Sequence, residues 1–150
     1  MKAVIQRVNQ ASVKVEGQII SKIESGLLVL LGITHTDGPE ETKWLCNKIV
    51  NLRIFNDEIG VMNKSLKDVQ GDVIIVSQFT LMASTKKGNR PSYIKAANTE
   101  IAIPIYERFI IEIEAVLGKK VGTGKFGADM KINLQNDGPV TIVIDTEFKQ

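Results

Sequence analysis

The sequence predicts an α+β fold, with a mixed or antiparallel sheet or a small β-barrel flanked by two main helices. Three observations predict it: apolar and polar residues alternate near both ends, continuous apolar runs lie between, and two stretches show helical spacing. The 150 residues, 43% hydrophobic and 24% charged, have the size and composition of one globular unit. We therefore expect a single domain over residues 1–150.

The first third of the chain is predicted to be mostly β-structure. Apolar residues alternate with polar ones from Val4 to Val15, and Glu16-Gly17 is a short turn that leads into a second strand over 18–21. The apolar run over 27–33, which lies next to glycines, is typical of a strand buried on both faces.

A first helix is predicted over residues 39–52. Asp37-Gly38-Pro39 supplies a capping residue and a proline suited to the first helical turn. Cys46 lies among the apolar positions of this helix, so we interpret it as part of the core. Those positions are Leu45, Cys46, Ile49, Val50 and Leu52.

The middle of the chain combines buried and polar segments. A short hairpin-type connection is expected at 56–60, and a second buried strand at 73–76. This strand runs directly into the polar stretch 77–80, and residues 86–92 form a basic loop that contains glycine and proline.

A second and longer helix is predicted to begin at Asn98 or Thr99. It ends at Gly118, because glycine commonly terminates helices. Pro104 is expected either to kink this helix or to mark its first turn.

Charge and hydropathy exclude several classes of protein. Lys plus Arg is 19 and Asp plus Glu is 17, and the net charge of +2 is too small for coating nucleic acid by bulk charge. The longest apolar run, over 26–33, is far shorter than the roughly 20 residues of a membrane-spanning helix. The N-terminal stretch does not fit a secretory signal. We expect no membrane partner and a cytoplasmic location.

The sequence offers few ligands for a cofactor. His35 is the single histidine and Cys46 the single cysteine, so neither an intramolecular disulfide nor a His/Cys zinc site is expected. The usual glycine-rich phosphate-binding motifs do not occur. We therefore expect no metal and no other cofactor.

Several conspicuous residues have an ordinary structural interpretation. His35 is interpreted as structural or merely exposed, and Trp44 and Tyr106 as packing residues rather than platforms for base stacking. The acidic residues of the second helix are interpreted as a solvated face and not as a catalytic carboxylate pair. These acids are Glu107, Glu112 and Glu114.

Two polar stretches are candidates for chemistry, and the first is Ser77-Gln78-Phe79-Thr80. Its hydrogen-bonding side chains follow a buried strand, where they line a pocket or satisfy the backbone of the strand end. Thr80 is a candidate nucleophile, but no acid, base or amine lies near it in sequence.

The second stretch, over 136–141, contains Gly138-Pro139. We expect it to be the turn of a hairpin between strands at 131–134 and 140–144. Proline also permits a cis peptide bond, which turns the local carbonyl groups in unusual directions. Carbonyl oxygens aimed into a pocket accept hydrogen bonds from an ammonium group, so this stretch is a candidate for binding an amine.

Taken together, these stretches give the chain a clear resemblance to the D-aminoacyl-tRNA deacylase family, which includes the D-tyrosyl-tRNA deacylases. The resemblance covers almost the whole chain without large insertions. The motifs that carry it are 6–8, 52–55, 77–81, 87–92, 123–130 and 136–141.

The resemblance implies a homodimer with its active site at the subunit interface. Ser77, Gln78, Phe79 and Thr80 would line the pocket of one subunit, and Gly138-Pro139, as a Gly-cis-Pro motif, would enter the pocket of the other. The carbonyls of this motif would hold the α-amino group of the substrate and leave no space for an L side chain, a selection by exclusion. Glycine, which has no side chain to reject, would also be admitted.

The implied reaction is hydrolysis of the ester bond of D-aminoacyl-tRNA, which releases the D-amino acid and tRNA and so serves proofreading and recycling in translation. Main-chain N–H groups near Phe79 and Thr80 would stabilise the oxyanion. Water would attack with help from the ribose 2′-hydroxyl of the terminal adenosine, and Thr80 as a covalent nucleophile is the competing proposal. The phosphates of the acceptor end would contact the basic residues Lys86, Lys87 and Arg90, and those at 119–125.

Two other functions compete with this one. The first is nucleic-acid binding without hydrolysis, because proteins resembling this family have been linked to DNA-unwinding elements and the basic loops are compatible with that. Such a role would be expected to bring an added basic tail, whereas this sequence stops four residues after Thr146. The second is a threonine-based esterase acting on small molecules, which retained activity in Thr80→Ala would exclude.

Overall fold

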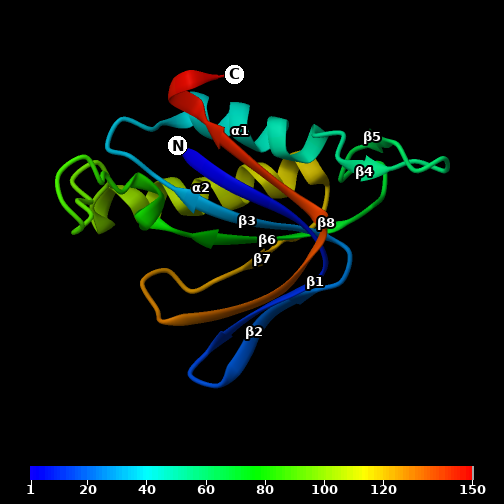
Figure 1. The fold of residues 1–150 in the computed structure, drawn as a ribbon, viewed down its shortest axis with the longest axis horizontal. Helices are drawn as coiled ribbons and strands as arrows, with labels where there is room; N and C mark the ends of the chain where they lie inside the picture. Colours follow the sequence, from blue (N-terminus) through cyan, green and yellow to red (C-terminus); the bar gives the residue numbers. More distant parts are fainter. Residues whose placement is uncertain (150) are drawn as a thin grey trace.

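The long strand β1 (Lys2–Val15) organises the fold in a computed structural model that describes residues 1–149. Its first half pairs antiparallel with β3 (Gly26–Gly32) and its second half with β2 (Gln18–Ile23). Along its other edge, β1 pairs antiparallel with β8 (Met130–Asp145). The predicted β-rich start is therefore confirmed, and β2 and β3 both pair with β1 (Figure 1).

The sheet continues through parallel strands and curls into a nearly closed barrel. β3 pairs with β6 (Asp72–Ser77), and β6 pairs with β7 (Gly122–Thr123), both in parallel. The Ser21 hydroxyl accepts a hydrogen bond from the Thr123 amide at 3.0 Å and donates one to the Thr123 carbonyl, which joins β2 to β7. Seven of the apolar side chains that these strands turn inward form a small buried cluster. The mixed sheet predicted from the sequence is confirmed.

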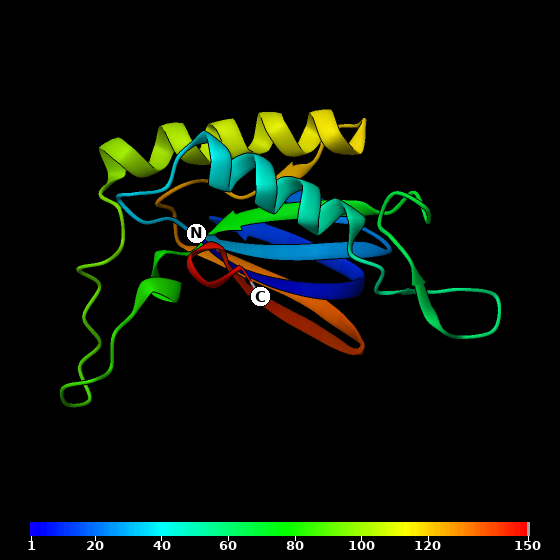
Figure 2. The ribbon, with the colours of Figure 1, turned by 90° about the horizontal axis from the view of Figure 1, so that it is seen from above.

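Two helices cover one face of the sheet, α1 (Pro39–Asn51) and α2 (Thr99–Leu117) (Figure 2). The larger apolar core lies between them and the sheet and includes the buried Cys46, as predicted. None of the helices within residues 1–149 combines the length and apolarity that crossing a membrane requires.

The helix ends follow from the residues that the sequence places there. Pro39 occupies the first turn of α1, and the Glu41 carboxylate accepts a hydrogen bond from the Gly38 amide at 2.9 Å. Asn98 caps α2 by accepting from the Ile101 amide at 3.1 Å. Pro104 lies in the second turn of α2, so it does not mark the first turn.

The remaining elements are short. β4 (Phe55–Asn56) and β5 (Met62–Lys64) form the expected hairpin-type connection. Two single-turn 3₁₀ helices follow, η1 (Phe79–Met82) directly after β6 and η2 (Thr146–Phe148) directly after β8.

The prediction of a hairpin at the C-terminal end is wrong. Residues 130–145 form one strand, because both of its halves find a partner in the 14-residue β1. The segment 136–141 bulges out where the pairing passes from Val8 to Gln6, so Gly138-Pro139 interrupts a single ladder.

The acids of the second helix are also less exposed than a solvated face implies. Glu107 is exposed, but Glu112 and Glu114 are half-buried. The Glu114 carboxylate accepts a hydrogen bond from the Val121 amide at 3.1 Å and pairs with Lys120 at 3.6 Å. It therefore positions the chain between α2 and β7, which helical periodicity alone does not reveal.

Candidate active site

A cavity of about 300 Å³ lies at the carboxyl ends of β3 and β6, and we call it the Ser77 cavity. Ser77, Gln78 and Phe79 line one side of it, and 126–130 line another. Both parallel strands end here, and polar groups that follow the carboxyl ends of neighbouring parallel strands meet at one edge of a sheet. The predicted polar stretch thus borders a pocket, while Thr80 lies on the adjoining turn outside the lining.

Close packing against β3 fixes the η1 turn beside this cavity. A Cβ atom on Gly32 would lie 3.0 Å from the Leu81 Cβ atom and 3.1 Å from the Gln78 carbonyl oxygen, so glycine is needed for this approach. The Gln78 amide donates to the Leu31 carbonyl at 2.7 Å. No acceptor within residues 1–149 receives the amides of Phe79 and Thr80, the first two of the turn.

The Thr80 hydroxyl is held by a neutral group. The Gln78 side-chain amide donates to it at 2.5 Å, and both residues belong to the same turn. A threonine nucleophile needs a base to take its proton, and an amide nitrogen is not a base. Asp129 is the one carboxylate in the lining of the Ser77 cavity, and it is exposed and paired with Lys131 at 3.0 Å.

Sequence reasoning gave no role to 126–130, which form a wall of the cavity. The signal in the sequence is the motif over 123–130, which contributes to the family resemblance but indicates no function by itself. Beneath this wall, the Tyr106 ring lies 5.8 Å from the Phe126 ring. The Tyr106 hydroxyl donates to the Ile75 carbonyl at 2.8 Å, and the Gly124 amide donates to the same oxygen at 3.2 Å. Burial raises the pKa of Tyr106 to about 12.

Gly138-Pro139 lies elsewhere on the same chain. Its peptide bond is cis, and both residues are exposed on β8 opposite Arg7. Arg7 pairs with Leu27 of β3, and Ser77 pairs with Leu31, four residues further along β3. β6, which carries Ser77, is the third strand from β8 in the order β8-β1-β3-β6. Strand geometry then separates the two motifs by roughly 20 Å along the sheet. One copy of the chain does not bring them together.

Arg7 anchors the Gly138-Pro139 bulge from inside the sheet. Its side chain is buried, and its Nε atom lies 3.2 Å from an Asp137 carboxylate oxygen. It also donates to the Ile54 carbonyl at 2.7 Å and to the Asp137 carbonyl at 3.3 Å. Gly138 has φ of +124°, and a Cβ atom there would lie 3.1 Å from the guanidinium.

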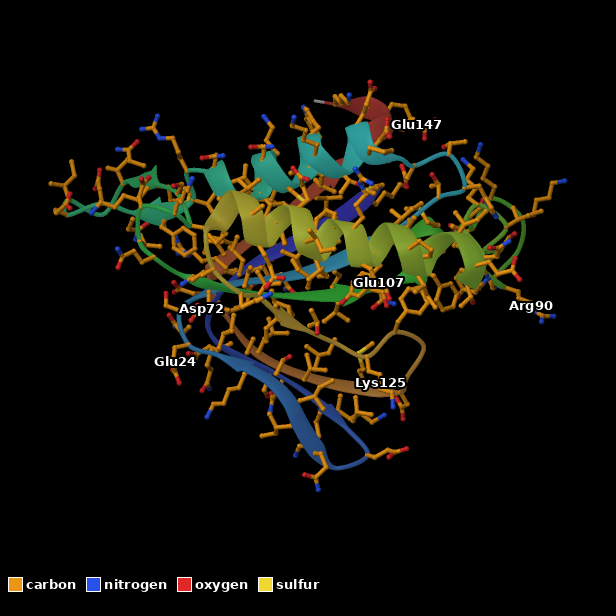
Figure 3. The ribbon with its side chains drawn as sticks, turned by 180° about the vertical axis from the view of Figure 1, so that it is seen from behind. Glu24, Asp72, Arg90, Glu107, Lys125 and Glu147 are labelled. Carbon is orange, nitrogen blue, oxygen red and sulfur yellow. The ribbon has the colours of Figure 1, made fainter. Side chains whose placement is uncertain are left out.

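The predicted basic residues lie on an exposed loop. Lys86, Lys87 and Arg90 are exposed, and the loop is closed at its base by paired backbone hydrogen bonds between Ser84 and Ser92. Arg90 points away from the body of the molecule (Figure 3). Within residues 1–149, none of these three cations takes part in an ion pair.

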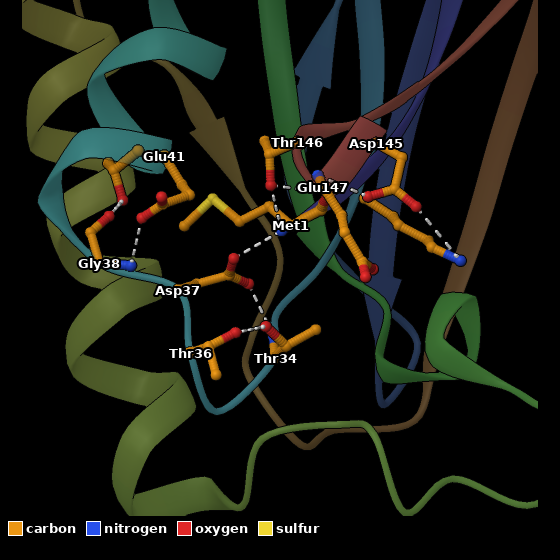
Figure 4. A network of polar contacts seen from close by, with 11 residues as sticks. Met1, Thr34, Thr36, Asp37, Gly38, Glu41, Asp145, Thr146 and Glu147 are labelled. Atoms are coloured by element: carbon orange, nitrogen blue, oxygen red, sulfur yellow. Dashed lines mark hydrogen bonds and ion pairs between the residues drawn. The ribbon is translucent and has the colours of Figure 1, made fainter. Parts of the chain in front are cut away.

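A larger cavity of about 660 Å³, the His35 cavity, lies between this loop and the two chain ends. Two of its acids serve the fold: Asp37 accepts from the Met1 ammonium at 2.6 Å, and Asp145 pairs with Lys2 at 3.5 Å (Figure 4). The backbone N–H groups of Glu41 itself and of Gly38 lower the pKa of the Glu41 carboxyl. His35 is exposed, in agreement with its ordinary interpretation. No cluster of metal-ligating side chains exists in the described part of the chain.

Comparison with known sequences identifies relatives along the whole chain. A family model described as D-Tyr-tRNA(Tyr) deacylase matches residues 4–145. The D-aminoacyl-tRNA deacylases of Bacteroides thetaiotaomicron and Flavobacterium psychrophilum are each 61% identical over 150 residues, which is 100% of this chain and of theirs.

Solved structures agree in fold. A structure titled c-Myc DNA Unwinding Element Binding Protein superposes with a TM-score of 0.93 at 44% identity and covers 97% of this chain and 99% of its own. A structure titled as a probable eukaryotic D-amino acid tRNA deacylase superposes with a TM-score of 0.84 at 16% identity, covering 95% and 97%. At that identity the second likeness concerns the fold alone.

Proposed function

The chain belongs to the D-Tyr-tRNA(Tyr) deacylase family, and we propose that its reaction, hydrolysis of the ester bond of D-aminoacyl-tRNA, takes place in the Ser77 cavity. The observation that carries this location is the pair of unpaired amides at Phe79 and Thr80 beside the cavity. Preorganised N–H groups at such a place stabilise the oxyanion of ester hydrolysis.

In this reaction the protein stabilises the oxyanion, and the substrate itself supplies the group that transfers the proton. Water adds to the ester carbonyl, the oxyanion binds the Phe79 and Thr80 amides, and the bond to the ribose oxygen breaks. The amino acid leaves as a carboxylate, one proton of the attacking water is released to solvent, and the other passes to the ribose oxygen. The 2′-hydroxyl of the terminal adenosine relays that proton, because the Thr80 hydroxyl is bonded to an amide and not to a base.

Chiral selection is assigned to Gly138-Pro139 of a second copy. The two motifs lie far apart on one copy, so a site that contains both requires a homodimer with the active site at the interface. The exposed carbonyls of the motif receive the α-amino group and exclude an L side chain, and glycyl esters are accepted. Pro139→Ala is then expected to relax the rejection of L-aminoacyl esters, and unchanged chirality in this variant would contradict the assignment.

The tRNA acceptor end approaches over the basic loop. Lys86 belongs both to this loop and to the lining of the His35 cavity, where Asp37 and Asp145 already have cationic partners, so the nearby phosphates meet free cations. We assign Lys86, Lys87 and Arg90 to phosphate contacts and the terminal adenosine to the Ser77 cavity. Residues 1–150 act as one catalytic domain without a cofactor, in the cytoplasm, where aminoacyl-tRNA is used.

The decisive experiment compares two charged tRNAs. Purified chain is incubated, with EDTA present, with D-tyrosyl-tRNA and separately with L-tyrosyl-tRNA, and the loss of each ester is followed over time. Loss of the D-ester alone is the expected result. Loss of both esters would remove the chiral filter but keep the hydrolase.

A second candidate function is DNA binding without hydrolysis. It is favoured by the 44% identical structure, whose title describes binding to a DNA element. In the same experiment this function predicts that neither ester is lost although nucleic acid is bound.

A further inference from the structure

The outer face of α1 presents the chain's single tryptophan among cations, and we call this face the Trp44 surface. Trp44 is half-buried: it packs against the main core, and two lysines cover its ring. The Lys48 and Lys149 nitrogens each lie 5.5 Å from the ring centroid. The packing role expected for Trp44 therefore accounts for only part of its surface.

The charge of this surface is strongly one-sided. Its lining contains the cations Lys43, Lys48, Arg53 and Lys149 and a single acid, Glu40. The resulting +3 exceeds the +2 of the whole chain, so the rest of the chain is negative on balance. Within residues 1–149, none of the four cations takes part in an ion pair.

Hydrogen-bond acceptors lie beside the ring. The side-chain amide nitrogens of Asn47 and Asn51 donate to the carbonyls of Lys43 and Asn47, at 2.9 and 2.8 Å. Both asparagines are exposed, and these bonds leave their side-chain oxygens available to donors such as base amino groups.

We propose that the Trp44 surface binds a short single-stranded segment of nucleic acid, with one base stacked on Trp44 and the backbone phosphates on the surrounding cations. An aromatic face bordered by cations is how proteins bind single strands without sequence preference. The two lysine ammonium groups repel each other over the ring. Phosphates that draw them aside therefore expose the face that the base occupies.

This inference does not rest on the hydrolytic reaction. The Trp44 surface shares no lining residue with the Ser77 cavity, and an oligonucleotide that carries no amino acid has no aminoacyl ester to cleave. The two conclusions therefore fail separately: a chain that deacylates D-tyrosyl-tRNA and ignores the oligonucleotide contradicts only the Trp44 surface.

The test uses the fluorescence of the single tryptophan in the full-length chain. A 12-nucleotide single-stranded oligoadenylate is expected to quench it saturably. Four neutralised phosphates predict a slope of about −2.8 for the logarithm of the binding constant against the logarithm of salt, or about a sevenfold loss of affinity when salt doubles. Trp44→Leu is expected to weaken binding of the labelled oligonucleotide about tenfold or more, measured by anisotropy.

Matched variants separate stacking from charge. Lys43→Gln with Lys48→Gln is expected to reduce the salt slope by about 1.4. Lys14→Gln with Lys22→Gln removes two exposed lysines from β1 and β2 and is expected to change nothing. Trp44→Phe, which keeps an aromatic ring, is expected to retain most of the affinity that Trp44→Leu loses.

Three results would overturn the proposal. The first is no quenching and no binding at low salt. The second is equal affinity for inorganic polyphosphate, unchanged in Trp44→Leu, which would make this face a general polyanion patch. The third is self-association of the chain that Trp44→Leu abolishes, which would assign the face to a second copy.

Discussion

Arg7 shows how one buried side chain supports the exposed Gly138-Pro139 segment. It is the buried cation of β1, and its bonds reach the Ile54 carbonyl and both the carbonyl and the carboxylate of Asp137. A planar guanidinium satisfies several oxygens at fixed angles, and an ammonium group does not. The position of the Gly138-Pro139 bulge therefore depends on the shape of Arg7 as well as its charge.

Arg7→Lys is expected to lower the free energy of unfolding by about 1 to 3 kcal/mol, because buried oxygen atoms lose donors. It is also expected to reduce discrimination between D- and L-tyrosyl-tRNA, because the bulge loses its anchor. Urea unfolding and the two ester assays measure the two effects. A stable variant with full discrimination would show that Arg7 does not position the bulge.

A substitution at Gly32 tests the role of the η1 turn. Gly32→Ala places a methyl group 3.0 Å from the Leu81 Cβ atom, so the turn with the Phe79 and Thr80 amides must move. We expect a large fall in kcat with little change in KM, and a stability loss of about 1 to 3 kcal/mol. Gly38→Ala is the control, since the nearest atom there is 3.6 Å away on a flexible side chain. Equal activity in both variants would contradict the role of the turn.

Tyr106, which packs beneath the cavity wall, is expected to make the stability of the chain depend on pH. Its pKa in the folded chain is about 12, against about 10 when unfolded, so the folded state holds this proton longer. The stability contributed by neutral Tyr106 is complete below about pH 10 and is lost as the pH rises toward 12, by up to about 2 to 3 kcal/mol. The free energies of unfolding of the wild type and Tyr106→Phe, measured at a series of pH values, should converge over this range. Parallel curves would show that Tyr106 is not the group responsible.

At the scale of elements, local signals in the sequence predicted both helices and most strands. α1 and α2 match because proline, asparagine and glycine mark their ends and their apolar residues recur at helical spacing. The C-terminal hairpin was wrong because Gly-Pro is a local turn signal, whereas the partner that turns 130–145 into one strand is β1, more than 100 residues away. The wall at 126–130 has no periodicity, so its place in the site followed only from the fold.

The packing of α1 against α2 makes a chemical prediction. Burial, with a smaller contribution from the charge of Glu112, raises the pKa of the Cys46 thiol, and its sulfur faces the Phe109 carbonyl at 3.6 Å. Because the thiolate is the reactive form, Cys46 should not react with a disulfide reagent in the native chain. It should react fully in denaturant, and the midpoint of labelling should coincide with the midpoint of unfolding. Fast labelling under native conditions would show that α1 and α2 separate readily.

At the scale of the whole molecule, the distance between the two motifs predicts complementation between chains. A chain with Gly32→Ala, which displaces the Phe79 and Thr80 amides, keeps an intact Gly138-Pro139 motif, and a chain with Gly138→Ala keeps an intact Ser77 cavity. If each site combines the cavity of one copy with the Gly138-Pro139 motif of the other, every mixed dimer contains one intact site. Random pairing then restores about a quarter of the wild-type rate on D-tyrosyl-tRNA after the two chains are unfolded and refolded together. Each variant refolded alone is the control.

A tag on one chain shows whether mixed dimers have formed. If they form and the mixture recovers no activity, both motifs would belong to the site of a single copy, against the separation that β1, β3 and β8 impose.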